Sequence, residues 1–280
     1  METARGVPRI PKQPEAVSVP LRHDGKEEPM DSKTRFSNRV DWYVKYRPSY
    51  PKAAVDYLYD EVGLRPDCSI ADIGSGTGIF SRLLLERGSR VLAVEPNDEM
   101  RAVSERMSNG DPHFRAVPGS AEATGLADRS VEFIVCAQSF HWFDRNAAKA
   151  EFQRILRPGG KVILIWNSRL ESGTPFREAY ERLIQTYGTD YKSVRHRNVS
   201  RKELLAFFRD GTMREARFSM SQQFDFDGLK GRLLSSSYMP LPGHPRHDAM
   251  MEELRNLFDK YNQNGTVSLD YETVLYWGEV

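Results

Sequence analysis

Short apolar runs alternate with segments of helical periodicity over most of the chain. From residue 69 an apolar run is followed by a glycine-rich turn, a helical segment and a second apolar run. Apolar runs of this length are typical of strands buried on both faces of a parallel sheet, and helical spacing between them indicates crossover helices. Strands are predicted at residues 70–73, 90–94, 113–117, 130–136, 161–166, 212–218 and 266–277. The pattern therefore predicts an α/β fold.

Helices are predicted where apolar residues recur every three or four positions. The first begins near residue 34 and must end near Arg47, because Pro48 and Pro51 forbid its continuation. The other helical segments are 52–62, 79–87, 97–108, 145–156, 174–187, 203–209, 226–238 and 246–261. Residues 1–33 are polar, rich in proline and without periodicity, so we expect a flexible N-terminal arm there.

Three glycines at alternate positions, Gly74, Gly76 and Gly78, directly follow the first strand. Without Cβ atoms the backbone can bend sharply and lie against a ligand. Glu95 stands at the end of the second strand, at the edge where open α/β sheets bind ligands, and a carboxylate there can accept both hydroxyls of a ribose. Taken alone the glycine turn is weak evidence, because such turns also join strands to helices in other α/β domains.

The turn departs from the dinucleotide-binding fingerprint at two positions. Ile79 occupies the place where that fingerprint requires a small residue, and Asp72 lies two residues before the first glycine. An acid in the turn would repel a pyrophosphate but would suit a cofactor that carries an amine and a sulfonium. A nicotinamide-dependent oxidoreductase is therefore the less favoured alternative.

Five stretches, in this order and spacing, resemble the class I methyltransferases that use S-adenosylmethionine. They are R-F-S-N-R-V-D-W-Y-V-K-Y-R-P-S-Y-P, A-D-I-G-S-G-T-G, V-L-A-V-E-P-N-D-E-M, G-S-A-E-A-T-G-L-A-D-R-S-V-E-F-I-V-C-A-Q-S-F-H-W-F and L-R-P-G-G-K-V. The resemblance is closest to the small-molecule branch that includes UbiE-like and trans-aconitate methyltransferase-like proteins. It implies a Rossmann-like, seven-stranded, mostly parallel sheet with helices on both faces and an antiparallel last strand.

The resemblance assigns residues 34–280 to a methyltransferase domain. We expect helical lid insertions at about 168–210 and 225–263, where the chain matches no family motif. The first of these contains a basic cluster that is either a solvated face or a rim that attracts an acidic acceptor. The cluster consists of Lys192, Arg195, His196, Arg197, Arg201 and Lys202.

The resemblance also implies S-adenosylmethionine as the cofactor. Asp72 would orient the methionine end, Glu95 would bind the ribose, and the loop after the third strand would meet the adenine. The cofactor-binding residues that we expect are Tyr43, Arg47, Asp72, Gly74, Ser75, Gly76, Gly78, Glu95, Pro96, Met100, Ser120, Ala121, Glu122 and Gln138.

Four of these residues have a structural alternative. Tyr43 and Arg47 would lie near the cofactor carboxylate, or their helix would simply pack on the sheet. Met100 would touch the adenine or belong to the core. Glu122 would accept a hydrogen bond from the adenine amine, or would begin a helix, where an acid favours the dipole.

Methyl transfer from a sulfonium is an in-line displacement, for which orientation and exclusion of water are the main catalytic tools. His141, just beyond the fourth strand, is the nearby side chain suited to proton transfer at neutral pH, although its aromatic neighbours also suit a packing role. A carboxylate acceptor would need no base. We expect a small-molecule acceptor, with a carboxylate as one candidate, and a non-catalytic cofactor-binding module as the alternative function.

Composition narrows the partners and the compartment. The net charge of +1 over 280 residues makes no electrostatic case for nucleic acid, and motifs of DNA methyltransferases are absent. No apolar run is long enough to span a membrane and no apolar segment marks a secretion signal, so we expect a cytoplasmic protein. Cys68 and Cys136 border or lie in predicted strands and suit inert thiols, and no cluster at ligand spacing predicts a metal. The sequence carries no signal of oligomeric state.

Overall fold

The computed structural model describes residues 40–191 and 199–280, and for Val40, Asp41 and Tyr43 it describes the backbone alone. The predicted N-terminal arm, residues 1–33, lies outside the described residues. The same holds for four members of the predicted basic cluster: Lys192, Arg195, His196 and Arg197.

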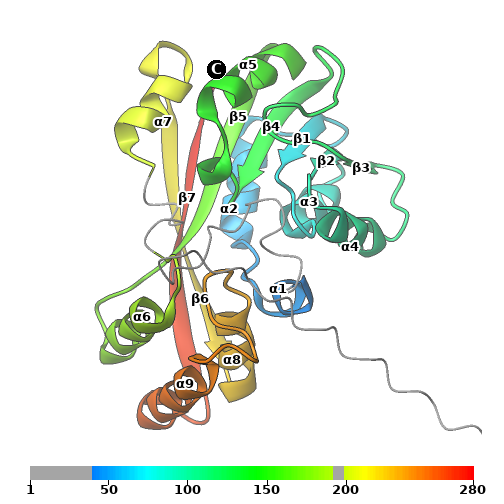
Figure 1. Cartoon of the computed structure of the whole chain (residues 1–280). Helices are drawn as coiled ribbons and strands as arrows, with labels where there is room; N and C mark the ends of the chain where they lie inside the picture. Colours follow the sequence, from blue (N-terminus) through cyan, green and yellow to red (C-terminus); the bar gives the residue numbers. More distant parts are fainter. Residues whose placement is uncertain (1–39, 192–198) are drawn as a thin grey trace, which may run out of the picture. The chain divides into compact units, whose positions relative to one another are not determined.

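In the described part of the chain, strands form one sheet of seven in the order β3-β2-β1-β4-β5-β7-β6 (Figure 1). The first five run parallel, whereas β7 is antiparallel to both of its neighbours. The strands are β1 Ser69–Ile73, β2 Arg90–Val94, β3 Phe114–Val117, β4 Val131–Ala137, β5 Leu156–Arg169, β6 Arg214–Phe224 and β7 Val267–Gly278. The predicted Rossmann-like sheet with an antiparallel last strand is confirmed.

Two strands are longer than the sequence pattern predicts. β5 starts at Leu156, so the R-P-G-G stretch between the predicted helix 145–156 and the predicted strand 161–166 lies inside the strand at a shift of register, with Gly159 at φ +76°. β6 pairs with β7 as far as Phe224. Its residues alternate between exposed and partly buried positions, as an edge strand requires, so a search for apolar runs misses its second half.

Helices cover both faces of the sheet. They are α1 Val40–Tyr46, α2 Lys52–Tyr57 with the π-helical turn Leu58–Val62, α3 Ile79–Leu85, α4 Asp98–Ser108, α5 Arg145–Ile155, α6 Pro175–Tyr187, α7 Arg201–Phe207, α8 Phe226–Leu234 and α9 His247–Tyr261. Leu58 and Leu84 bring α2 and α3 onto one face of the central strands. Phe152 and Phe207 bring α5 and α7 onto the other.

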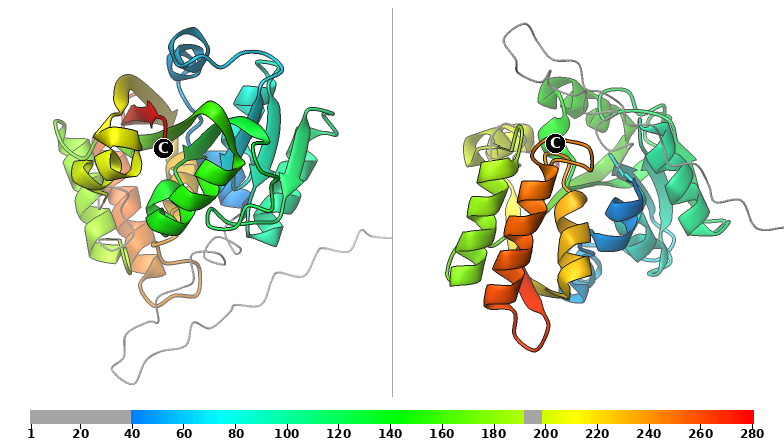
Figure 2. Two further views of the ribbon diagram at one scale, coloured as in Figure 1. Left: turned by 90° about the horizontal axis from the view of Figure 1, so that it is seen from above. Right: turned by 60° about the horizontal axis from the view of Figure 1, so that its bottom comes forward.

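Three helices, α6, α8 and α9, enclose a second hydrophobic core with the far ends of the last strands, and we call them the helical cap. Figure 2 shows them in a row, with α1 beside α8. Trp42 of α1 packs against this core. The absence of a side chain at Gly231 of α8 makes room for Tyr46, because a Cβ there would lie 2.1 Å from its ring. The helix α1 is therefore held against the cap.

The connections place the cap at the ligand-binding edge of the sheet. β5 leads into α6 and β6 leads into α8, while α9 leads into the antiparallel β7. Because β1 and β5 are parallel, the carboxyl ends of β5 and β1 meet at the same edge, where the glycine turn begins. The predicted lid segment 168–210 needs a correction, since its second helix, α7, packs on the sheet core beside Phe140 and not in the cap.

No helix within the two described ranges is long and apolar enough to cross a membrane. Both cysteines are buried and free.

Candidate cofactor and active site

The glycine turn after β1 adopts the backbone conformation that its sequence requires. Gly74, Gly76 and Gly78 have φ values of +67°, +58° and +77°, in the left-handed region that disfavours side chains. The amide of Gly74 donates to the carbonyl of Val94 over 2.8 Å. A Cβ on Gly74 would lie 2.6 Å from the Cβ of Ser139, which follows β4. The turn is thus fixed between the ends of three neighbouring strands.

Glu95 at the end of β2 points into this turn. Its Oε2 accepts from the amide of Gly76 over 2.8 Å, and its Oε1 accepts from the amide of Asn97 over 2.9 Å. Burial raises the pKa of Glu95, while these two amide donors oppose the rise. Each carboxylate oxygen keeps a second lone pair, so Glu95 can also accept from two ligand hydroxyls.

Asp72 lies beneath the turn and is fully buried. Its Oδ2 accepts from the hydroxyl of Ser81 over 2.6 Å, whereas its Oδ1 has no hydrogen-bond partner among the described residues. Burial raises the pKa of Asp72 to about 7, with a smaller contribution from the nearby charge of Glu95. A buried acceptor left in this state is costly unless a donor reaches it.

Two hydroxyls of the same turn share this property. Ser75 Oγ and Thr77 Oγ1 are buried and make no hydrogen bond within the described part of the chain. With Asp72 Oδ1 they give this segment three buried polar atoms without a described partner. Together with Glu95 these atoms suit a ligand that carries an ammonium donor and a ribose diol, and this combination fits S-adenosylmethionine.

The helix after β2 supplies the next part of the site. Asn97 is the N-cap of α4, and its side chain accepts from the amide of Met100. Met100 is buried, yet its Sδ lies 3.8 Å from the position of a Cβ on Gly76. Met100 therefore belongs to the core and borders the turn at once. Pro96, half-buried, lies between Glu95 and this cap.

The predicted adenine loop follows β3. Ser120 pairs with Ala123 in a narrow antiparallel bridge, and Ala121 is buried. Glu122 lies in this turn and begins no helix, so the structural alternative for it is wrong. Its Oε1 accepts from the amide of Asp144 over 2.9 Å at the start of α5, which leaves its other oxygen for a ligand amine.

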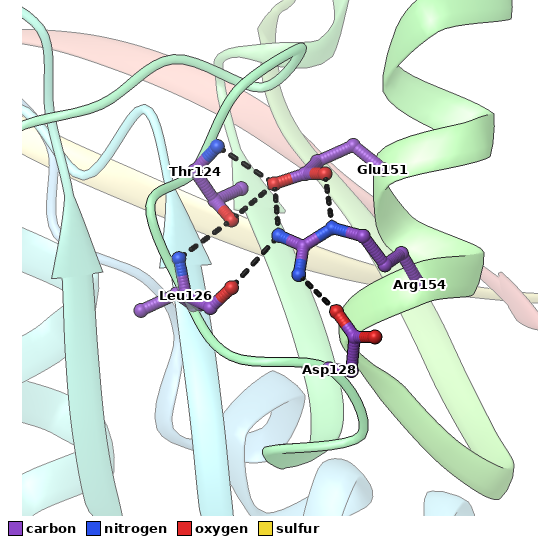
Figure 3. A network of polar contacts seen from close by, with 5 residues as sticks. All are labelled: Thr124, Leu126, Asp128, Glu151 and Arg154. Carbon is purple, nitrogen blue, oxygen red and sulfur yellow. Dashed lines mark hydrogen bonds and ion pairs between the residues drawn. The ribbon is translucent and has the colours of Figure 1, made fainter.

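A polar network fixes the rest of this loop against α5, as Figure 3 shows. Glu151 accepts from both the amide and the hydroxyl of Thr124, over 2.8 and 2.5 Å. Arg154 donates to Glu151, to Asp128 and to the carbonyl of Leu126. The hydrogen bond from Arg154 is the largest of the effects that lower the pKa of Glu151 to about 2. The network holds the loop that carries Ser120, Ala121 and Glu122.

The segment after β4 forms the remaining wall. Gln138 has φ +62°, and its Nε2 donates to the carbonyl of Asn167 over 3.3 Å. His141 Nδ1 accepts from Trp166 Nε1 over 3.4 Å. A neutral imidazole has one nitrogen lone pair available as a base, and this hydrogen bond occupies it. The geometry therefore favours a wall role for His141 over proton transfer.

The N-terminal residues of the predicted set come from α1 and from the residue that follows it. Arg47 Nη2 donates to the carbonyl of Ser235 at the end of α8 over 2.9 Å. Tyr43 lies in α1, where the structure describes its backbone alone.

The sequence analysis missed one contact that holds the segment after α1. Asn167 Nδ2 donates to the carbonyl of Ser49 over 2.8 Å, and its Oδ1 accepts from the buried Thr273. No local pattern marks that contact.

Comparisons with known proteins decide between the cofactors. A family model described as "Methyltransferase domain" matches residues 71–164. An uncharacterized methyltransferase-like protein of Schizosaccharomyces pombe is 30% identical over 258 residues, which are 90% of this chain and 97% of that protein. The chain belongs to the class I S-adenosylmethionine-dependent methyltransferases.

Other proteins similar to this chain are also named methyltransferases. An uncharacterized methyltransferase of Mycobacterium tuberculosis is 38% identical to this methyltransferase over 167 residues, which are 60% of this chain and 64% of that one. A solved structure from Anaeromyxobacter dehalogenans, provisionally named a type II methyltransferase, has a TM-score of 0.64 at 22% identity. It covers 84% of this chain and 98% of its own, and it supports the fold. The nicotinamide alternative and the non-catalytic alternative both give way to a methyltransferase that uses S-adenosylmethionine.

Proposed function

We propose that this methyltransferase transfers the methyl group of S-adenosylmethionine to a small-molecule acceptor, which binds between the glycine turn and the helical cap. The observation that carries the proposal is the pair of acids at the turn: Asp72 with an orphaned oxygen, and Glu95 aimed at Gly76. The motifs favour the UbiE-like and trans-aconitate methyltransferase-like branch. We assign the cofactor site to the fourteen predicted positions, with Glu122 directed to the adenine through the carboxylate oxygen that does not accept from Asp144.

The mechanism needs little bond-making by the protein. When bound, S-adenosylmethionine supplies a methyl group already activated on a sulfonium. Asp72 accepts from the ammonium of the methionine end, and Glu95 holds the ribose hydroxyls in place. Gln138 and the aromatic segment after it exclude water from the transfer point. Orientation of this kind can supply roughly 7–11 kcal/mol of the barrier.

The surroundings of His141 bear on the acceptor. Because Trp166 occupies its Nδ1 lone pair, we assign no proton transfer to this histidine. An acceptor whose nucleophile carries no proton at neutral pH then fits best, and a carboxylate oxygen is such a nucleophile. The hydrogen bond at His141 thus supports the carboxylate acceptor that the sequence analysis gave as one candidate.

The proposal is tested by binding and transfer measured separately. Calorimetry with full-length protein should show S-adenosylhomocysteine binding at micromolar affinity. Incubation with methyl-labelled S-adenosylmethionine and a panel of small carboxylic acids, phenols and amines should label an acid and leave the rest unlabelled. Labelling of phenols or amines alone would overturn the carboxylate assignment, and labelling of a protein or nucleic acid in place of all three would overturn the small-molecule acceptor.

A further inference from the structure

Two arginines contact the helical cap, the buried Arg232 and the largely buried Arg169, and they differ in their charge partners. Arg169 at the end of β5 pairs with the carboxylate of Glu181 on α6. Glu181 also accepts from the hydroxyl of Tyr191 over 3.0 Å and from Gln185 Nε2 over 2.8 Å. This arginine has the counter-charge that a buried cation needs.

Arg232 on α8 is only 8% exposed and lacks such a partner. Its Nε donates to the hydroxyl of Tyr271 over 3.1 Å, and its Nη1 donates to Ser236 Oγ over 3.2 Å and to Ser235 Oγ over 3.4 Å. Among the described residues no carboxylate forms an ion pair with it. A guanidinium stays charged in proteins, and within the described part of the chain this positive charge meets neutral hydroxyls and the ring of Tyr271 but no carboxylate.

The position of Arg232 connects it to the cofactor side of the site. Ser235 receives a hydrogen bond on its carbonyl from Arg47, which directly follows α1, and another on its hydroxyl from Arg232. Ser235 is fully buried and Ser236 nearly so. The guanidinium of Arg232 therefore hydrogen-bonds to the same serine that links the end of α1 to the cap. This serine lies at the edge of the sheet where the glycine turn lies.

We propose that Arg232, with the hydroxyls of Ser236 and Tyr271, binds an acid group of the methyl acceptor. The planar fork of a guanidinium matches the two oxygens of a carboxylate, and the hydroxyls can rotate to donate to the same anion. An anion would supply the counter-charge that Arg169 already has in Glu181. This inference rests on the proposed function, and it assigns the specificity of the acceptor site to a residue of the cap.

The test uses full-length protein saturated with S-adenosylhomocysteine. Hexanoate, hexanamide and inorganic phosphate serve as probes, and calorimetry measures their dissociation constants. Hexanoate should bind at least about tenfold more tightly than hexanamide, because a hydrogen bond to a charged group is lost in the amide. Equal binding of the acid and the amide would overturn the inference, and tighter binding of phosphate than of hexanoate would replace the carboxylate with a phosphate as the bound group.

Variants assign the effect to one side chain. Arg232→Gln should remove the preference for hexanoate, and Arg232→Lys should retain part of it, because the charge stays while the fork is lost. Arg182→Gln, an exposed position on α6, is the matched control with the same loss of charge and should leave the preference unchanged. If Arg232→Gln does not fold, the Lys variant and the wild-type acid–amide comparison still decide.

The same experiment separates this inference from the proposed function. Failure of wild-type protein to bind S-adenosylhomocysteine would count against the proposed function. Weaker S-adenosylhomocysteine binding by Arg232→Gln, without any effect on hexanoate, would show that Arg232 serves the carboxylate of the cofactor, and would overturn the acceptor role alone.

Discussion

The glycine turn and the helical cap each contain a buried charge without a full set of partners, but the two regions differ in how they are built. Beneath the turn, at the end of β1, one oxygen of Asp72 has no hydrogen-bond partner among the described residues. In the cap, Arg232 has no carboxylate partner in the same described ranges, and it lies in a core assembled from distant helices. The cofactor site that we propose at the turn is thus formed by residues that are close together in the sequence, whereas the acceptor site that we propose requires α8 to meet β7.

The largest expected effect tests the contrast between the two arginines of the cap. Arg169→Met should destabilise the protein by about 3–5 kcal/mol, because it leaves the charge of Glu181 buried and unpaired. Arg232→Met, which strands no charge, should change the free energy of unfolding by less than about 1 kcal/mol. Denaturant unfolding of the cofactor-free protein measures both. Equal losses would mean that Arg232 is a structural residue of the cap.

A side chain on Gly74 should disrupt the turn itself. Gly74→Ala places a Cβ 2.6 Å from that of Ser139 and requires φ +67°, so a loss of about 2–4 kcal/mol in stability is expected from strain and overpacking together. Thermal unfolding and calorimetry with S-adenosylhomocysteine measure the result. Gly110→Ala is the control, since its φ is +73° but nothing lies within 4 Å of the new atom. Similar losses in both variants would exclude the contact with Ser139 as the cause.

Removal of Glu95, the acid to which we assign ribose binding, should affect cofactor binding more than the fold. Glu95→Ala should weaken binding of S-adenosylhomocysteine by about 1–3 kcal/mol, because hydrogen bonds to a buried charged group are lost. Glu99, an exposed acid in the first turn of α4, is the control, and Glu99→Gln should bind like wild type. An unchanged dissociation constant for Glu95→Ala would remove Glu95 from the cofactor site.

The orphaned acid should make stability depend on pH. The pKa of Asp72 is raised from 3.8 to about 7 in the folded protein, so between these values the folded state binds more protons than the unfolded state. Stability of the cofactor-free protein should then fall as pH rises through this window, by at most about 1.4 kcal/mol per pH unit for one group. Asp72→Asn should flatten this decline in a denaturant series. A wild-type curve that rises over the same window would contradict the raised pKa.

The smallest effect is expected from the network that holds the adenine loop. Arg154→Ala removes contacts to Glu151, Asp128 and Leu126 (Figure 3), but the arginine is partly exposed, so the loss in stability should be about 0.2–1 kcal/mol. S-adenosylhomocysteine binding should weaken by a similar amount. The lowered pKa of Glu151 predicts that this contribution is lost as pH falls from 4.5 toward about 2. Retained affinity in Arg154→Ala would show that the loop holds its shape without the network.

Much of the fold could be predicted from local pattern. β2 has its predicted bounds, and α6 begins after Thr174 as its capping residues indicate. The lengths of the strands and the packing partners of the helices were harder to predict, because they depend on elements that are distant in the sequence. The far half of β6 looks polar until its pairing with β7 is known, and α7 looks like a lid helix until its Phe207 is seen to pack against Phe140. Glu122 follows a strand like a helix-starting acid, yet its turn closes on Ala123.

The cofactor end of this methyltransferase was determined by the sequence, because positive φ angles, a helix cap and an acid at a strand end are properties of adjacent residues. The tertiary structure alone decided which charges are compensated. The sequence does not show that Arg169 and Arg232 differ. In the structure α6 brings Glu181 to Arg169 at the end of β5, whereas Arg232 lies among hydroxyls. Electrostatic energy depends on distance in space, and distance in space between remote segments is what a single sequence does not contain.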